Sequence, residues 1–293
     1  MEFREQLAIY AERCEAELER QLPLIPCPQM EVVEAMRYSL LGGGKRLRAA
    51  LLLAFYEACG GTNNKALPFA CALEMIHAYS LIHDDLPCMD DDDIRRGKPS
   101  CHIAYGEATA LLAGDGLLTH AFDVMLHADF EPLRILKAAG CVSRAIGAYG
   151  MIGGQVMDLA NEEKKEISEE ILSQTDMLKT GALIRAACEM GCILAGAEEG
   201  KISAAKAYAE KIGLAFQITD DILDVTSSTE ELGKPVGSDL AQSKSTYVSL
   251  YGIEKAKNVS AKLLDEAKEE LKTAGFYGDF LYSLADYIQG RKN

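Results

Sequence analysis

Residues 212–224 read IGLAFQITDDILD, and their pattern decides the fold class. Apolar side chains recur every three or four residues, from Ile212 through Phe216 to Leu223, which is the spacing of one helix face. Residues 47–58 repeat that spacing. Alternating strands with hairpin turns are absent from the sequence, and only eight prolines interrupt a chain rich in alanine and leucine. The sequence therefore predicts an all-α protein.

Turn-forming residues divide the chain into roughly ten helices joined by short connections. The expected breaks lie at Pro23–Pro28, Gly60–Asn64, Pro87–Pro99, Gly153–Gly154, Asn161–Ile167, Gly196–Lys201 and Thr226–Ser238. None of these breaks has the composition of a domain linker, and 293 residues are enough to bury one large core. We expect a single domain over residues 1–293.

The charge of the chain limits its partners. Its 30 basic and 45 acidic residues give a formal net charge of −15, which repels a polyphosphate backbone and argues against nucleic acid. The nine cysteines include no CxxC pair, so reduced core thiols are expected rather than disulfides or a zinc site. The longest glycine-free apolar run, Ala49 to Tyr56, is too short to span a bilayer. We expect a cytoplasmic protein with no membrane span.

A dense acidic cluster follows one apolar helix. Residues 83–98 read HDDLPCMDDDDIRRGK, so six aspartates are followed by three cations. Crowded carboxylates raise one another's pKa unless hard cations neutralise them, and Mg²⁺ bound through carboxylates and substrate phosphates is the usual solution. The alternative is a solvated acidic loop.

A second acidic cluster lies within the stretch 212–224. Asp220, Asp221 and Asp224 stand three and four residues apart, so all three carboxylates share one side of the expected helix. Like charges at this spacing destabilise an isolated helix, and aspartate is a poor helix former. Two such clusters in one chain therefore indicate a metal-assisted site rather than surface charge.

Basic residues accompany the acidic ones. Residues 42–48 read GGGKRLR, and Arg95–Arg96 closes the first acidic cluster. Lys45 and Arg48 are three apart on an expected helix whose N-terminal end follows the glycines, an arrangement that favours anions, although a solvated basic turn is the alternative. Arg46 stands where a Walker A loop needs Ser or Thr, which argues against an NTPase. The combination predicts a site for two diphosphates, one held by metal ions and one by side-chain cations.

The order and spacing of these motifs resemble the trans-isoprenyl diphosphate synthases, and in particular the bacterial farnesyl diphosphate synthases, over nearly the whole chain. The matching motifs are Gly-Gly-Lys-x-x-Arg at 43–48, Asp-Asp-x-x-x-x-Asp at 84–90 with Arg95-Arg96-Gly97, Gly154-Gln155, Lys179-Thr180-Gly181, Gln217, Asp-Asp-x-x-Asp at 220–224, Gly233-Lys234 and Lys244-Ser245-Thr246. The resemblance implies the isoprenoid synthase fold, a bundle of long helices around a central cavity, and a homodimer. Val248 stands where the bacterial relatives often have proline, which we expect to alter a local turn only.

The resemblance also implies a role for individual residues. Mg²⁺, three ions per active site, would be held by Asp84, Asp85, Asp90, Asp220, Asp221 and Asp224, with Mn²⁺ as the alternative metal. Arg95, Lys179 and Lys234 would bind the allylic diphosphate. Isopentenyl diphosphate would be bound by Lys45, Arg48, His77 and Arg96, and Lys244 joins the substrate-binding residues. Gln217, Lys179 and Thr180 would stabilise the carbocation by oriented dipoles, and the departing diphosphate would accept the proton.

Product length is expected to depend on the residues just before the first aspartate motif. In the family, bulk at this point forms the cavity floor, and Tyr79 stands five residues before Asp84, about 7.5 Å deeper along the helix. This favours farnesyl diphosphate as the product. A helical wheel places Ser80, rather than Tyr79, directly beneath Asp84, so ordinary core packing of Tyr79 is the alternative.

The motifs leave other products and other activities as alternatives. Geranyl or geranylgeranyl diphosphate are the alternative products. A terpene cyclase usually mixes Asn, Ser or Thr with Glu in its second metal site, whereas this chain has a second all-aspartate set. A non-catalytic partner subunit would have lost aspartates or arginines from these motifs, and none is missing here.

Overall fold

Long α-helices make up almost the whole structure, a computed structural model that describes residues 2–62, 64–162, 164, 167–226 and 246–291. The first helices are α1 (Phe3–Gln21), α2 (Met30–Leu40), α3 (Leu47–Ala58), α4 (Leu67–Asp84), α5 (Cys101–Tyr105), α6 (Glu107–Leu126) and α7 (Pro132–Ile146). They are followed by α8 (Met151–Glu162), α9 (Glu169–Asp176), the π-helical turn η1 (Met177–Gly181), α10 (Ala182–Ala195), α11 (Glu199–Thr226), α14 (Tyr247–Tyr251), α15 (Ile253–Thr273) and α16 (Asp279–Gln289). A two-residue antiparallel ladder joins β1 (Ile94–Arg95) to β2 (Lys98–Pro99). The all-α prediction is confirmed.

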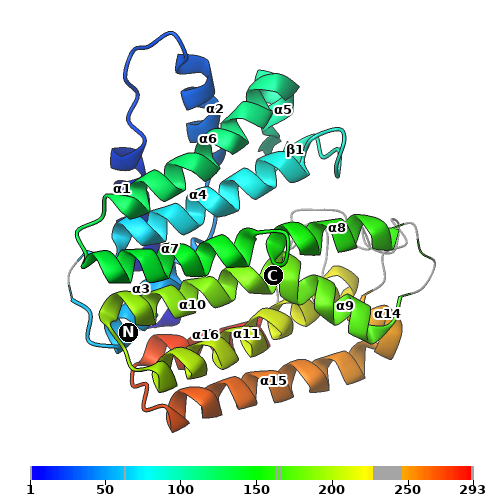
Figure 1. Cartoon of the computed structure of the whole chain (residues 1–293). Helices are drawn as coiled ribbons and strands as arrows, with labels where there is room; N and C mark the ends of the chain where they lie inside the picture. Colours follow the sequence, from blue (N-terminus) through cyan, green and yellow to red (C-terminus); the bar gives the residue numbers. More distant parts are fainter. Residues whose placement is uncertain (1, 63, 163, 165–166, 227–245, 292–293) are drawn as a thin grey trace.

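The axes of the long helices α4, α6, α7, α10, α11 and α15 are roughly aligned, and the chain reverses direction between neighbours such as α10 and α11 (Figure 1). Helix α11 packs on α15, α4 on α6, and α10 on both α3 and α7. The N-terminal helix is fastened to the C-terminal one by aromatic contacts, since Phe3 stacks on Phe280 with ring centroids 5.1 Å apart. The two ends of the chain therefore close one bundle.

Burial explains why α3 and α4 run through the middle of the bundle. Leu51, Leu52 and Leu53 are consecutive and all fully buried, so α3 is covered on every side. Nearly the whole of α4 is buried in the same way. A helix that is apolar all round needs neighbours all round. Helix α4 therefore leaves the core only at its C-terminal end, where it delivers Asp84 to the end of the bundle that also carries β1, α8, α9 and α14 (Figure 1).

Two local expectations were wrong. The predicted break at Gly153–Gly154 lies inside α8, and the chain turns instead over residues 147–150. Gly154 serves close packing, because a Cβ there would overlap the backbone nitrogen of Lys179. Lys45 was expected on the same helix as Arg48, but α3 begins only at Leu47, so Lys45 precedes the helix.

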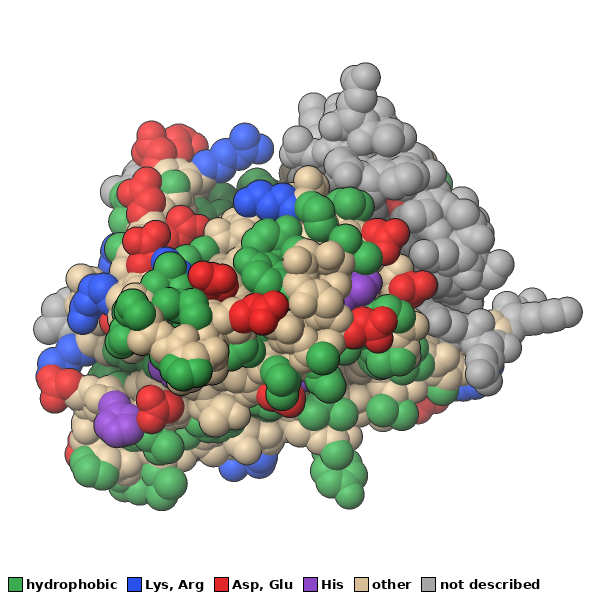
Figure 2. All heavy atoms as spheres, turned by 90° about the horizontal axis from the view of Figure 1, so that it is seen from above, with side chains coloured by type: hydrophobic (Ala, Val, Ile, Leu, Met, Phe, Trp, Pro, Cys, Tyr) green, Lys and Arg blue, Asp and Glu red, His purple; other side chains and the backbone are tan. Residues whose placement is uncertain are grey.

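The length and polarity of the helices decide whether any of them could span a membrane. None of the helices that the described residues form is both long and apolar enough to cross a bilayer. Seen from above, the molecule shows acidic side chains spread among hydrophobic ones, with fewer Lys and Arg side chains between them (Figure 2). This surface agrees with the net charge of −15.

Candidate active site

The first acidic cluster begins where α4 ends. The chain turns back after Asp84, and the backbone nitrogen of Asp90 donates to the carbonyl oxygen of Asp84 at 2.9 Å. Burial raises the pKa of Asp84 to about 6, and the negative charge of Asp90 adds to the rise although Lys179 opposes it. The Asp84 carboxylate is therefore held in a place where its negative charge is costly without a cation.

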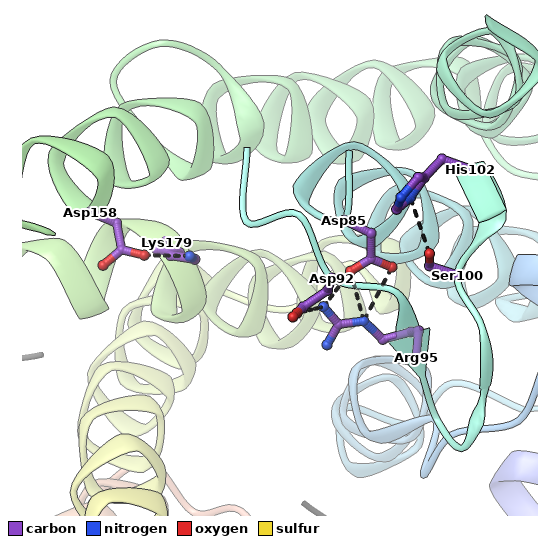
Figure 3. Close-up of polar contacts among 7 residues, drawn as sticks. All are labelled: Asp85, Asp92, Arg95, Ser100, His102, Asp158 and Lys179. Carbon is purple, nitrogen blue, oxygen red and sulfur yellow. Dashed lines mark hydrogen bonds and ion pairs between the residues drawn. The ribbon is translucent and has the colours of Figure 1, made fainter. Parts of the chain in front are cut away.

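The neighbouring Asp85 has a different environment. It is 2 % exposed, and its Oδ1 accepts from Arg95 Nε at 3.0 Å and from a second nitrogen of the same guanidinium. Asp92 accepts from Arg95 as well, at 3.0 Å (Figure 3). The β1–β2 hairpin thus folds Arg95 back onto the end of α4, where two carboxylates fix the guanidinium. A role of Asp85 as a metal ligand stays a prediction.

The second acidic cluster lies near the C-terminal end of α11. Asp220 Oδ1 accepts from Arg291 Nη1 at 2.7 Å, and Asp221 Oδ2 accepts from the backbone nitrogen of Tyr247 at 2.7 Å. Asp224 is buried, with 2 % of its surface exposed. Asp220 is more open, with 40 % of its side chain exposed. Asp220 and Asp221 thus each accept a hydrogen bond from another part of the chain, and a role of the three aspartates as metal ligands stays a prediction.

Lys179 lies on the π-helical turn η1, close enough to the first cluster to act on Asp84. Its Nζ donates to Asp158 Oδ2 at 2.5 Å (Figure 3). Its positive charge lowers the pKa of Asp84 in the first cluster and opposes the rise at Asp176. Burial, followed by the charges of Asp221 and Asp158, raises the pKa of Asp176 to about 8. One ammonium group therefore acts on carboxylates from α4, α8 and α9.

A basic cavity of about 240 Å³ opens beside these residues. Its lining includes Lys45, Arg48, His77, Arg96, Thr180 and Phe216. Burial and then the charges of Arg48 and Arg96 hold the pKa of His77 well below its usual value, so the imidazole is neutral near pH 7. Among the described residues no group accepts from the buried Nε of Arg48. A cavity of this kind suits an anion with several oxygen atoms.

Glycines allow the basic loop to approach Arg96. Gly43 and Gly44 both have positive φ, at 97° and 126°, and Arg96 donates to the carbonyl oxygen of Gly43. A Cβ added to Gly44 would lie 2.9 Å from an Arg96 nitrogen. Any larger residue at this position would displace the guanidinium, so the glycine run positions a cation.

The geometry agrees with the result of a family comparison. The sequence model described as Polyprenyl synthetase matches residues 29–275, most of the chain. The chain belongs to the polyprenyl synthetase family. Prenyl transfer is therefore its activity, and the helical bundle found here is the fold of its isoprenyl synthase relatives.

Curated relatives of this polyprenyl synthetase are named for a C20 product. The geranylgeranyl diphosphate synthase of Cyanophora paradoxa is 46 % identical over 268 residues, covering 89 % of this chain and 88 % of the relative. A chloroplastic geranylgeranyl pyrophosphate synthase of Capsicum annuum is 48 % identical over 265 residues, covering 89 % of this chain and 71 % of the relative. The names of these relatives therefore differ from the expected product, farnesyl diphosphate.

Solved structures point to a wider range of products. An FPP/GFPP synthase from Zymomonas mobilis in its apo form aligns with a TM-score of 0.86 at 37 % identity, covering 98 % of this chain and 99 % of that chain. A geranyltransferase from Legionella pneumophila aligns with a TM-score of 0.85 at 35 % identity, covering 99 % and 97 %. The prediction of a trans-isoprenyl diphosphate synthase is confirmed at the level of the family.

The structure brings most of the predicted site residues to one end of the bundle. Gln217 lies on α11, one turn before Asp220 and Asp221. Tyr79 is buried, with 5 % exposed, whereas Ser80 Oγ donates to the carbonyl oxygen of His77 at 3.0 Å within α4. Lys234 and Lys244 lie outside the described residues.

Sequence reasoning missed three residues of the site, Asp158, Asp176 and Arg291. Asp158 follows the quoted Gly154 by one helical turn, and Asp176 precedes Lys179 by three residues, so both stood next to recognised motifs. Arg291 lies next to the end of the chain, and its guanidinium stacks over the Phe216 ring at 4.6 Å. No local signal in the sequence pointed to this last contact.

Proposed function

We propose that this polyprenyl synthetase condenses isopentenyl diphosphate with dimethylallyl and then geranyl diphosphate, head to tail, and releases farnesyl diphosphate. One observation carries the proposal: the Lys179 ammonium pairs with Asp158 and acts on Asp84 and Asp176, and the next residue, Thr180, lines a cavity that also contains several cations. Two diphosphate groups need two binding sites, one rich in carboxylates that bind metal ions and one rich in side-chain cations.

Mg²⁺ fits the acidic place. Within the part of the chain that the structure describes, no three His, Cys, Asp or Glu side chains form a set that alone could hold a metal ion. Mg²⁺ is usually held by one or two carboxylates together with substrate phosphates, so a complete protein cage is not required. Asp84, whose negative charge is costly where it lies, would meet this need with Asp90, and Asp220 on α11 would add a carboxylate from the second cluster. Bound Mg²⁺, or Mn²⁺ in its place, would assist departure of the allylic diphosphate.

The chain's own residues would bind and orient the substrates. Arg95 and Lys179 would hold the allylic diphosphate, since each is already fixed by a carboxylate. The basic cavity would hold isopentenyl diphosphate through Arg48 and Arg96. A neutral His77 would donate one N–H to an anion without titrating near pH 7.

Positive charge that develops on the allylic carbon would be stabilised by oriented dipoles. Thr180 lines the cavity and follows Lys179 on the widened turn η1, and Gln217 lies on α11. Hydroxyl and amide oxygens can face a developing cation without reorganisation. The proton lost from the isopentenyl unit would pass to the departing diphosphate.

Tyr79 would set the chain length of the product. Its ring lies edge-on to His83 with centroids 5.8 Å apart, and among the described residues its buried hydroxyl has no hydrogen-bond partner. Burial and then the charge of Asp84 raise its pKa to about 12, so the ring is neutral and lies within the field of the first cluster. A bulky ring below Asp84 would stop a growing chain. Geranylgeranyl diphosphate is the second candidate product, favoured by the names of the curated relatives.

A homodimer is part of the proposal. Large apolar side chains are exposed along α6, α7, α8 and the turn between α7 and α8, and they are Leu126, Leu133, Leu136, Tyr149, Ile152 and Val156. Exposed apolar groups in such number favour association. Light scattering coupled to size-exclusion chromatography should therefore give twice the mass of one chain, which is 31.8 kDa.

Product analysis tests the function. Purified protein is incubated with isopentenyl diphosphate, dimethylallyl diphosphate and Mg²⁺, with EDTA as control, and the products are identified by mass spectrometry. We expect farnesyl diphosphate that depends on metal, and a longer product from Tyr79→Ala. Tyr79→Phe is the matched control, because it keeps the ring and should keep the product.

Each other outcome contradicts part of the proposal. Geranylgeranyl diphosphate from the unaltered enzyme would favour the second candidate and end the role given to Tyr79. An unchanged product from Tyr79→Ala would do the same. No product at all with any allylic primer would overturn the proposed reaction.

A further inference from the structure

The ion pair between Asp158 and Lys179 is short and partly shielded from water. Lys179 Nζ lies 2.5 Å from Asp158 Oδ2, and the two side chains are only 27 % and 26 % exposed (Figure 3). A lysine ammonium carries three N–H donors, so a contact with one carboxylate oxygen leaves donors for another anion. Asp158 comes from α8, whereas the proposed metal-binding aspartates come from the end of α4 and from α11.

Helix α8 contacts the segment around Lys179 at three successive levels. Gly154 lies so close to the Lys179 backbone that a Cβ would overlap its nitrogen. Asp158, one turn further along the same face, contacts the Lys179 side chain. Asn161 Nδ2 then donates to Thr175 Oγ1 at 3.1 Å. Backbone and side chain of Lys179 are thus both held by one helix.

The turn that carries Lys179 is itself unusual. Residues 177–181 form a π-helical turn between α9 and α10, and such turns often occur at functional sites. A widened turn changes the direction in which its side chains leave the helix. The close approach of Gly154 and the ion pair with Asp158 both fall on this turn, so α8 stabilises the altered direction.

We propose that Asp158 is a positioning residue for prenyl transfer: it holds the Lys179 ammonium so that the remaining donors face the diphosphate of the allylic substrate. The inference rests on the proposed function. Lysine has a long, flexible stem, so an unheld ammonium would have to be ordered when the substrate binds. Asp158 orders it beforehand. Because a misplaced group costs up to a hundredfold in rate, even partial loss of this order is measurable.

The negative charge of Asp158 also has an effect on diphosphate binding that is opposite to its positioning of Lys179, and the experiment must distinguish the two. A carboxylate near a diphosphate repels it, so removal of Asp158 could also improve binding. The 2.5 Å contact favours the first effect, because the carboxylate charge is largely compensated by the ammonium it touches. We therefore expect the loss of orientation to exceed the relief of repulsion.

The experiment is a double-mutant cycle of Asp158→Asn, Lys179→Gln and the double variant, with Mg²⁺ present. Calorimetry measures the Kd of an allylic thiodiphosphate, which binds like the substrate but does not ionise, and steady-state kinetics gives kcat and the KM of both substrates. Asp158→Asn should weaken the analogue and raise the allylic KM about tenfold. The KM of isopentenyl diphosphate should change less than twofold. In the Lys179→Gln background the Asp158 substitution should have no further effect.

Asn161→Ala is the matched structural control, since it removes an α8 contact that does not involve Lys179. It should leave the Kd of the analogue unchanged. The proposal is overturned if Asp158→Asn binds the analogue as the unaltered enzyme does, if both α8 variants weaken it equally, or if the two substitutions of the cycle act additively. Absence of turnover by the unaltered enzyme would instead contradict the proposed function.

Discussion

Replacing Asp84 by asparagine should make the metal-free protein more stable and inactive. Burial and the charge of Asp90 raise the pKa of Asp84 from 3.8 to about 6, a shift of about two units. Each unit corresponds to about 1.4 kcal/mol, so ionised Asp84 destabilises the fold by roughly 3 kcal/mol at pH 7.5. Asparagine has the shape of the protonated acid and carries no charge. The variant should therefore recover most of this free energy of unfolding.

The pH dependence gives the sign of the effect. Folding raises the pKa of Asp84, so the folded state binds more protons than the unfolded chain between pH 3.8 and about 6, and stability falls as the pH rises through that window. Above it the full advantage of Asp84→Asn is present. Below it the carboxyl is protonated in both states, and the advantage disappears.

The assay is thermal unfolding followed by circular dichroism, in EDTA, at pH 7.5 and at pH 5. A stabilisation of about 3 kcal/mol corresponds to a rise in Tm of about 6 to 12 °C for a domain of this size. Asp123→Asn is the matched control, because it removes one carboxylate from a side chain that is 61 % exposed and should change Tm little. Mg²⁺ with inorganic diphosphate should stabilise the unaltered protein more than the variant.

Two results would refute this reasoning. Equal or lower Tm of Asp84→Asn at pH 7.5 would show that the carboxylate is not under electrostatic stress in the folded protein. An advantage that is as large at pH 5 as at pH 7.5 would show that it arises from packing rather than from ionisation.

Three further substitutions test other parts of the structure. Gly154→Ala should lower the free energy of unfolding, measured in urea, by about 1–3 kcal/mol, because the added methyl group overpacks against η1. Gly200→Ala is the control, since its Cβ meets open space and should not lower the stability. Equal effects of the two substitutions would contradict the close approach of Gly154 to Lys179. Glu74→Gln should lower the free energy of unfolding by about 3 kcal/mol in the same assay, because Glu74 is 3 % exposed and pairs with the buried Arg46. A loss below about 1 kcal/mol would show that this ion pair does not stabilise the fold. Arg291→Ala should increase the affinity for Mn²⁺ several-fold, as measured by electron paramagnetic resonance. Arg291 Nη1 lies 2.7 Å from Asp220 Oδ1 and competes with a metal ion for this carboxylate. An unchanged affinity would show that Asp220 is not a metal ligand.

Much of the site could be predicted because its signals are local. Asp220, Asp221 and Asp224 fall within two helical turns, so helix geometry alone places them near one another. The same holds for His77 and Asp84, which the structure places on the single helix α4. The same geometry gave a wrong expectation for Lys45, which was predicted on the helix of Arg48 but precedes α3.

The sequence by itself determined the fold class, the family and the two aspartate clusters, since periodicity, motif order and local charge need no tertiary contact. Only the tertiary structure decided what each charged group touches. Asp85 became the partner of Arg95, Arg291 met Asp220 across 71 positions, and Asp158 met Lys179 across 21. Such pairs depend on how helices pack, and packing sets both the burial that shifts a pKa and the distance over which a charge acts.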